Sequence, residues 1–237
     1  MTLPRLLQDA ETWDDVTRGF AWQIDPEFSM LEACLNRWAR DTPDALAVRD
    51  MARGEDWSFA ALADASSRFA TLLRGHGVGR GDRVAVLAPQ GVEVLIAHFA
   101  CYHLAAIAVP MFALFGTDAL AYRLGDASVS AVVCDPERRP RTEAVLRQIG
   151  LQAAVLDTSD TGIWAEINEA EPLVDIAGVT AEDPAMMIYT SGTTGPPKGV
   201  LHAHRFLWGH LPSFELHHHR LAPDDIGWTP ADWAWIG

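Results

Sequence analysis

The sequence predicts an α/β fold in which a mostly parallel sheet is flanked by helices. Short apolar runs alternate with longer segments of helical periodicity, and Gly, Pro or polar residues separate the two. This alternation is typical of βαβ units. In such folds phosphate ligands bind at loops beyond the carboxyl ends of the strands, so these loops are the first candidates for a functional site.

The expected elements follow one another without a long structureless gap before residue 157. Asp25, Pro26 and Glu27 predict a helix start, with Asp as N-cap and Pro at the first helical position. The later elements are a strand at 45–49, a helix capped by Ser58 that ends at Gly75 and Gly77, a strand at 83–88, a helix at 92–106, a strand at 107–110, a helix at 117–126, a strand at 130–135, a helix at 141–149 and strands at 153–157 and 186–189.

Two segments need a choice between alternatives. Residues 94–115 contain no Asp, Glu, Lys or Arg, but two histidines and Pro110 make a buried helix and strand a better prediction than a membrane span. Residues 157–183 are acidic and lack periodicity, so they are expected to form a surface excursion or an internal linker. The N-terminus shows no secretory signal pattern.

Composition excludes several classes of partner and ligand. The formal net charge is −14, from 32 acidic and 18 basic residues, so the surface repels nucleic acid and anionic membranes. The 49% apolar content argues against disorder. Cys34, Cys101 and Cys134 are far apart and form no metal-binding pair, which favours reduced thiols and a cytoplasmic protein.

One decapeptide carries the clearest chemical signal. An apolar strand runs into Thr190, Ser191, Gly192, Thr193, Thr194, Gly195, Pro196, Pro197, Lys198 and Gly199. Glycines let the backbone approach a ligand and turn its N–H groups inward, hydroxyls add donors, and the two prolines stiffen the exit. Lys198 is the single lysine of the chain. The segment therefore predicts a loop that binds phosphate groups.

Two alternative interpretations explain the decapeptide less well. A Ser/Thr/Gly surface turn explains the composition but not the lone lysine. A Walker loop requires G-x-x-x-x-G-K-[ST], whereas Pro197 precedes Lys198 and Gly199 follows it, so the hydroxyl that would hold Mg²⁺ is missing.

The loop resembles the signature of the AMP-forming synthetase superfamily, which includes acyl-CoA synthetases, luciferases and peptide-synthetase adenylation domains. Further stretches resemble family blocks, and the end of the chain resembles the acetyl- and medium-chain acyl-CoA synthetase branch. These stretches are 79–86, 110–116 with 122–124, 228–237, and 20–28.

The resemblance implies a two-step reaction. A carboxylate attacks the α-phosphate of Mg-ATP, giving acyl-adenylate and pyrophosphate, and coenzyme A then takes the acyl group. It implies that the loop and Lys198 hold the β- and γ-phosphates, and that Trp235 and Ile236 lie beside the acyl pocket. The substrate carboxylate is already ionised, so no general base is assigned.

Other polar residues are given less weight. His217, His218 and His219 are consecutive and point in different directions, so a solvated helix end is favoured over a metal site. His202 and His204 share one face of a strand-like stretch and could line the nucleotide cleft. Arg123, on an apolar helix, is expected to form a structural ion pair.

The chain also departs from the family. Members are more than twice as long, and their blocks for Mg²⁺, adenine and ribose, together with a mobile C-terminal domain, have no counterpart here. Residues 1–237 are therefore expected to be a partial N-terminal AMP-binding domain that is inactive alone. A non-catalytic nucleotide-binding remnant and a different adenylating enzyme, such as a peptide-synthetase domain, stay open as alternatives.

Overall fold

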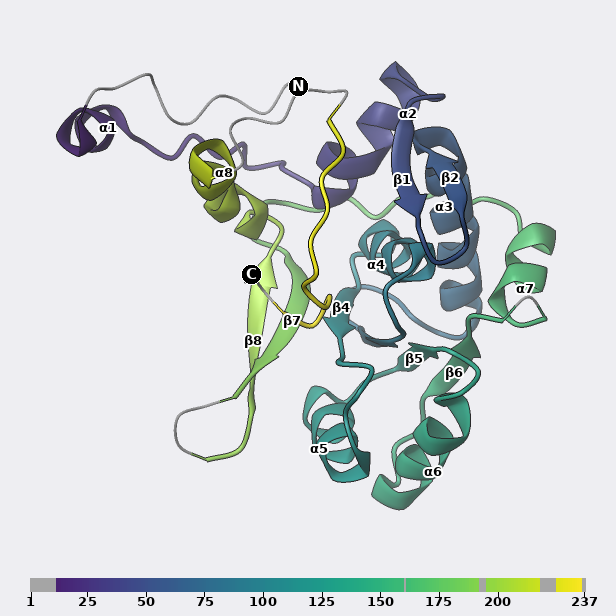
Figure 1. The fold of residues 1–237 in the computed structure, drawn as a ribbon. Helices are drawn as coiled ribbons and strands as arrows, with labels where there is room; N and C mark the ends of the chain where they lie inside the picture. Colours follow the sequence, from purple (N-terminus) through teal and green to yellow (C-terminus); the bar gives the residue numbers. More distant parts are fainter. Residues whose placement is uncertain (1–11, 160, 192–194, 218–224, 236–237) are drawn as a thin grey trace.

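The computed structural model describes residues 12–159, 161–191, 195–217 and 225–235 (Figure 1). Its centre is a six-stranded sheet of strand order β6-β5-β3-β4-β7-β8, in which only β8 runs antiparallel to its neighbour. The predicted α/β class is confirmed. The strands are β3 (Arg83–Leu87), β4 (Ile107–Pro110), β5 (Ala131–Cys134), β6 (Ala154–Asp157), β7 (Pro184–Thr190) and β8 (Lys198–Ala203).

Helices cover both faces of this sheet, which explains why its central strands are continuously apolar. Alternate residues of β3 point to opposite faces: Val84 and Val86 belong to one core, and Ala85 and Leu87 belong to the other. The first core packs under α3 (Phe59–Gly75) and α4 (Val92–His103). The second packs over α5 (Thr117–Ala127) and α6 (Arg139–Ile149), on the opposite side of the sheet in Figure 1.

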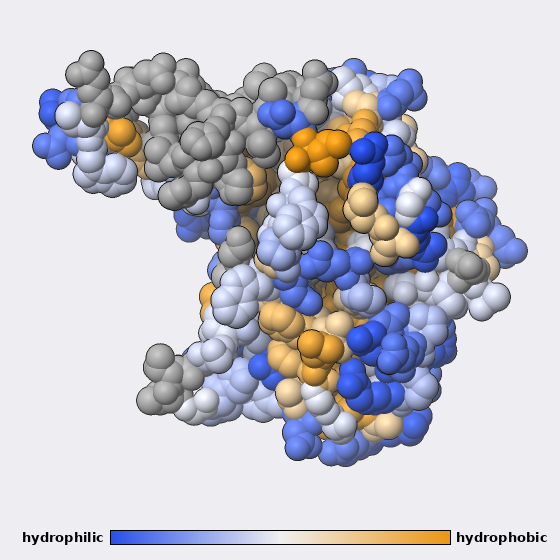
Figure 2. All heavy atoms as spheres, in the orientation of Figure 1, coloured by the Kyte–Doolittle hydropathy of each residue, from blue (hydrophilic) through white to orange (hydrophobic). Residues whose placement is uncertain are grey.

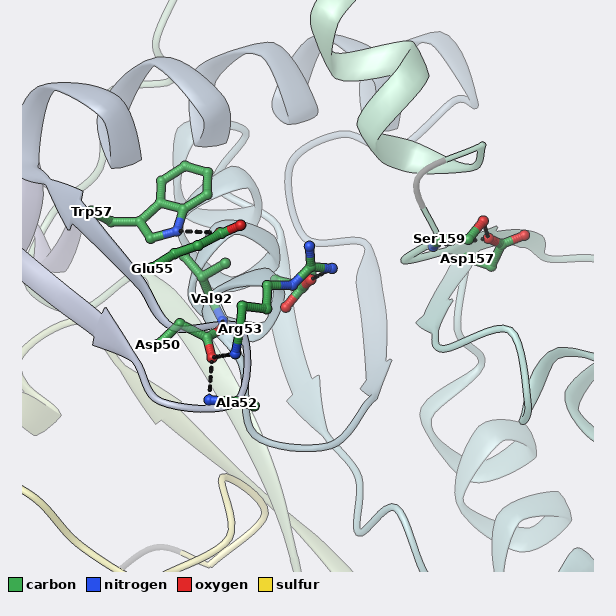
Figure 3. A network of polar contacts seen from close by, with 9 residues as sticks. Asp50, Ala52, Arg53, Glu55, Trp57, Val92, Asp157 and Ser159 are labelled. Atoms are coloured by element: carbon green, nitrogen blue, oxygen red, sulfur yellow. Dashed lines mark hydrogen bonds and ion pairs between the residues drawn. The ribbon is translucent and has the colours of Figure 1, made fainter.

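A separate β-hairpin, β1 (Leu46–Asp50) and β2 (Glu55–Ser58), is fastened to the start of α4. Buried Asp50 accepts hydrogen bonds from the N–H groups of Ala52 and Arg53 and, at 3.1 Å, from that of Val92 at the first turn of α4 (Figure 3). Arg53 also forms an ion pair with Glu93. A carboxylate at a helix N-terminus satisfies free N–H groups and complements the helix dipole.

The first predicted helix begins later than the sequence suggested. Asp25 accepts a side-chain hydrogen bond from the N–H of Glu27, and its carbonyl accepts one from the N–H of Phe28. The Asp-Pro-Glu stretch is thus a turn, and helical structure starts at Met30. It continues as a π-helical turn, η1 (Glu32–Asn36), and then as α2 (Arg37–Asp41). Competition from the Asp side chain for backbone donors explains the delayed start.

In the described part of the chain, three further helices lie outside the predicted elements. They are α1 (Trp13–Gly19), α7 (Ile163–Glu169) within the segment expected to be a surface excursion, and α8 (Phe206–His217) after β8. α7 is no loose excursion, because Ile163 and Ile167 are buried in the core beneath α3. Among the described residues, no helix combines the length and apolarity needed to cross a membrane.

Among the described residues, three histidines are buried. His98 and His103 of α4 and His204 after β8 are each at most 5% exposed. Desolvation by burial lowers the pKa of each to about 4. Since an unperturbed histidine titrates near ~6.5, these side chains are neutral at pH 7 and tolerate burial among apolar residues.

We expect stability to fall below pH 6.5 because of these histidines. Their folded-state pKa is lower than the unfolded value, so their contribution to stability is intact above ~6.5 and is lost as the pH falls toward 4. Each lowers the free energy of unfolding by up to about 1.4 kcal/mol per pH unit in that window. Urea unfolding of His103→Leu should show a shallower pH slope than the parent, whereas exposed His76→Gln should keep it. An unchanged slope in His103→Leu would contradict the assignment.

Candidate functional site

The predicted phosphate loop is the turn of an edge hairpin. β7 pairs with β4 at Ala108 and Met186, near its start, and then continues paired to β8 as far as Thr190 opposite Lys198. β4 ends at Pro110, which has no N–H to extend the ladder. The loop therefore emerges at the carboxyl end of a parallel strand, the position that α/β folds use for ligands.

Within the loop, the described residues face solvent. Ser191, Gly195, Pro196 and Lys198 are exposed, and Pro197 is half-buried. Gly192, Thr193 and Thr194 lie outside the described residues. Gly195 has a φ of 88°, a conformation that favours glycine, so this position of the loop depends on the absence of a Cβ atom.

A contact outside the sheet holds the hairpin in place. The hydroxyl of Tyr189 donates a hydrogen bond of 2.6 Å to Asp126 of α5 and lies 3.3 Å from the Arg123 carbonyl. Burial, together with the neighbouring carboxylate, raises the pKa of Tyr189, so the phenol keeps the proton that it donates. This bond fixes the end of β7 one residue before the loop begins.

The position opposite Tyr189 must be small. Gly199 pairs with Tyr189 across the hairpin, and a Cβ atom there would lie 3.2 Å from the Tyr189 ring and 2.9 Å from the Met187 sulfur. The glycine that follows Lys198 therefore lets β8 lie flat against the anchored tyrosine.

Strand geometry determines the direction of Lys198. Tyr189, Met187 and Gly199 share the face that packs on α5, so Thr190 and the directly opposite Lys198 lie on the other face. Ile188 lies on that face as well. The lone lysine is thus directed to the same side of the hairpin as the cavity described next.

A cavity of about 380 Å³ adjoins this face of β7. It lies between α4, β7, α8 and the segment 229–235, and we call it the α4–α8 cavity. Its described lining residues are Met30, Gln90, His98, Tyr102, Met186, Ile188, Phe206, Leu207, His210, Phe214, Thr229, Ala231, Asp232, Trp233 and Trp235.

Side-chain contacts hold the segment 229–235 over the cavity. Gln90, which follows β3, donates a hydrogen bond to the Ala231 carbonyl, and the Trp233 ring lies 5.7 Å from the His98 ring. The Nδ1 atom of His98 is hydrogen-bonded to the Tyr102 hydroxyl, at 3.4 Å. A second hollow, of about 570 Å³, lies between α8, β8 and residues Trp22 and Ile24. Figure 2 shows the outline of the molecule indented on the left of the view, beside the β7–β8 hairpin.

The remaining candidate site residues lie in different parts of the structure. Trp235 is 66% exposed and lines the α4–α8 cavity, whereas Ile236 lies outside the described residues. His204 is a core residue whose Nδ1 accepts the Met30 N–H, and His202 lines the second hollow, so they do not share a cleft. The ion pair expected for Arg123 is wrong: its guanidinium lies 4.0 Å from the Phe115 ring and donates to the Ala119 carbonyl.

No metal centre emerges from the described part of the chain, where no group of three or more His, Cys, Asp or Glu side chains is placed to hold an ion. His217 ends α8, and His218 and His219 lie outside the described residues.

Two features of the candidate site carry little signal in the sequence. The Tyr189–Asp126 bond joins residues 63 positions apart, and only the tyrosine beside the loop hinted at it. The contribution of α8 to the cavity was missed because Gly209 and Pro212 interrupt an otherwise apolar stretch.

Comparison with known proteins adds independent information. The family model described as AMP-binding enzyme matches residues 35–237. The chain is 27% identical to an acetyl-coenzyme A synthetase of Pseudoalteromonas translucida, covering 95% of this chain and 39% of that protein. It is 30% identical to acetyl-coenzyme A synthetase 2 of Eremothecium gossypii, covering 93% and 36%. The chain thus spans about two-fifths of the length of the curated relatives it matches.

Solved structures show the same fold. Apo MatB from Rhodopseudomonas palustris superposes with a TM-score of 0.69 at 30% identity, over 80% of this chain and 38% of that one. A Mycobacterium tuberculosis fatty acyl CoA synthetase superposes with a TM-score of 0.66 at 24% identity, over 76% and 36%, and supports the fold alone.

We expect Tyr189→Phe to loosen the hairpin without unfolding the sheet. Loss of a hydrogen bond to a carboxylate costs about 1.5–3 kcal/mol, which corresponds to roughly ten- to hundredfold faster amide exchange in 187–190 and 198–201. Hydrogen exchange measured by mass spectrometry checks this. Tyr122→Phe, on the exposed side of α5, is the matched control, and equal exchange in both variants would rule out the anchor.

Proposed function

The chain belongs to the AMP-binding enzyme family, and on that premise we propose that it carries the phosphate- and acid-binding part of an acyl-CoA ligase. The proposed reaction is the ATP-dependent activation of a short- or medium-chain carboxylic acid to an acyl-adenylate and then to acyl-CoA, with release of pyrophosphate and AMP. The acetyl-coenzyme A synthetases among its relatives support this reaction type.

One observation carries the proposal: the phosphate loop and the α4–α8 cavity share strand β7. Met186 and Ile188 line the cavity, and Thr190 begins the loop only two residues later, about 7 Å along the strand. Lys198 lies on the cavity side of the hairpin, opposite Thr190. An acid in the cavity and the phosphates of ATP at the loop would therefore meet at one edge of the sheet.

In this arrangement the protein acts by positioning and by charge. The carboxylate of the acid is ionised at neutral pH and attacks without a general base. Loop N–H groups, hydroxyls and Lys198 would hold the β- and γ-phosphates and stabilise the negative charge of the departing pyrophosphate. Because the protein carries a formal charge of −14, this local set of donors is needed to offset long-range repulsion of the nucleotide.

The described residues fit ATP phosphates better than they fit the metal. The hairpin supplies a lysine and hydroxyls at Thr190 and Ser191, whereas no acidic cluster suited to Mg²⁺ is found among them. We propose further that residues 1–237 are a partial N-terminal AMP-binding domain that does not complete the reaction alone. The one lysine of the chain, Lys198, is already assigned to the phosphate loop. The three free cysteines support a cytoplasmic location.

Lys198→Ala should reduce adenylation while preserving the fold. Removing a charge-assisted phosphate contact costs about 1.5–3 kcal/mol, or roughly ten- to hundredfold in rate. The main measurement is acid-dependent pyrophosphate exchange by the complete enzyme. Binding of pyrophosphate to residues 1–237 is the supporting measurement. Arg205→Ala removes a cation that lies beyond the carboxyl end of β8. It should change neither the exchange rate nor the binding of pyrophosphate. A parental exchange rate in Lys198→Ala would refute the role of the loop, and no exchange by the parent with any acid would favour a nucleotide-binding remnant.

Trp235→Gly should shift preference toward longer acids. The indole lines the α4–α8 cavity, so its removal lengthens the available space, and each added methylene is worth about 1–3 kcal/mol of discrimination in such a pocket. Relative kcat/KM for acetate, butyrate and hexanoate in the complete enzyme tests this. Trp228→Gly is the control, because Trp228 is 81% exposed and is not among the cavity residues. Identical ratios of kcat/KM among the three acids in Trp235→Gly and the parent would show that this tryptophan is not part of the wall.

A further inference from the structure

The α4–α8 cavity has a size and lining that select a particular kind of acid. Its volume of about 380 Å³ lies within the ~300–1,000 Å³ range of sites that enclose drug-sized ligands. That volume corresponds to about a dozen water molecules at ~30 Å³ each, far more than the single methyl group of acetate would fill.

The walls of the cavity are predominantly apolar. Aromatic rings come from three separate elements: Tyr102 of α4, Phe206 and Phe214 of α8, and Trp233 and Trp235 of the covering segment. Met186 and Ile188 of β7 form the side next to the phosphate loop. Contact with such walls favours an apolar ligand by about 0.8 kcal/mol for each buried methylene group, or roughly fourfold in affinity.

Charge in the cavity argues against a second carboxylate on the ligand. No Lys or Arg is found among the described lining residues, and Asp232 contributes a carboxylate that accepts the Ala234 N–H at 2.9 Å. His98 is neutral, because burial lowers its pKa to about 4. The His210 ring also lines the cavity, and its centroid lies 4.5 Å from that of the Phe206 ring. An anionic group placed here would be desolvated beside a like charge.

We infer that this cavity binds a monocarboxylic acid with an apolar aliphatic or aromatic body considerably larger than acetate, and that it rejects dicarboxylic acids. This inference rests on the proposed function in one respect, the orientation of the bound acid. The reacting carboxylate is taken to face the loop at Thr190. It differs from the substrate that the names of the curated relatives state, since those proteins are acetyl-coenzyme A synthetases.

Binding of free acids to residues 1–237, without ATP, tests the inference separately from catalysis. Saturation-transfer NMR and competition titrations would compare acetate, butyrate, hexanoate, phenylacetate and adipate. Hexanoate and adipate form a matched pair that differs only in the second carboxylate. Affinity should rise about fourfold per methylene from acetate to hexanoate, phenylacetate should compete with hexanoate, and adipate should bind at least about tenfold more weakly than hexanoate.

Two substitutions locate the binding. Ala231→Phe fills the cavity and should abolish the hexanoate signal, whereas Ala144→Phe, on the exposed side of α6, should preserve it. Asp232→Asn keeps an oxygen that accepts the Ala234 N–H but removes the negative charge. It should therefore reduce the difference in affinity between adipate and hexanoate. Circular dichroism establishes that each variant is folded.

Three outcomes would overturn the inference: equal affinity for acetate and hexanoate, equal affinity for adipate and hexanoate, or hexanoate binding that survives Ala231→Phe in a folded protein. None of these bears on the proposed function, which fails instead if the complete enzyme shows no acid-dependent pyrophosphate exchange with any acid. Selective hexanoate binding without such exchange would support the cavity assignment and refute the ligase.

Discussion

The hydrogen bond from Tyr189 to Asp126 is the contact on which the candidate site depends. β7 leaves its parallel partner β4 near Met186, so the three residues from there to the loop, 187–189, are held by β8 on one edge and by α5 through this bond. Without a fixed end of β7, neither Thr190 nor Lys198 would have a defined direction. Gly199 completes the constraint, since a larger residue would push β8 away from the tyrosine ring.

The parallel sheet explains why the two candidate binding regions adjoin. The carboxyl ends of β3, β4 and β7 lie at one edge of the sheet, so Gln90, the residues after Pro110 and the phosphate loop all follow that edge although they are far apart in sequence. Because side chains alternate along β7, its two faces make different contacts. Met187 and Tyr189 fasten the strand to α5, and Met186 and Ile188 line the α4–α8 cavity.

Electrostatics divides the protein into a charged surface and a neutral interior. The acidic surface disfavours nonspecific contact with polyanions, while the buried histidines of α4 and His204 carry no charge at pH 7. An apolar ligand can therefore enter beside His98 without displacing a buried ion. The buried carboxylates are compensated instead, since Asp50 accepts hydrogen bonds from three backbone N–H groups and Glu93 is paired with Arg53.

Local sequence determined much of this protein. Strand apolarity, the Ser58 cap and the glycine-rich decapeptide predicted the α/β class, most helices and the loop, because each depends on residues close together in the chain. Only tertiary structure decided the turn at Asp25, the burial of α7 under α3, and the stacking of Arg123 on Phe115. It also decided that Tyr189 binds Asp126 and that α8 closes a cavity with Trp235. These features join residues distant in sequence, and side-chain partners that far apart leave no periodic or spacing signal in the chain itself.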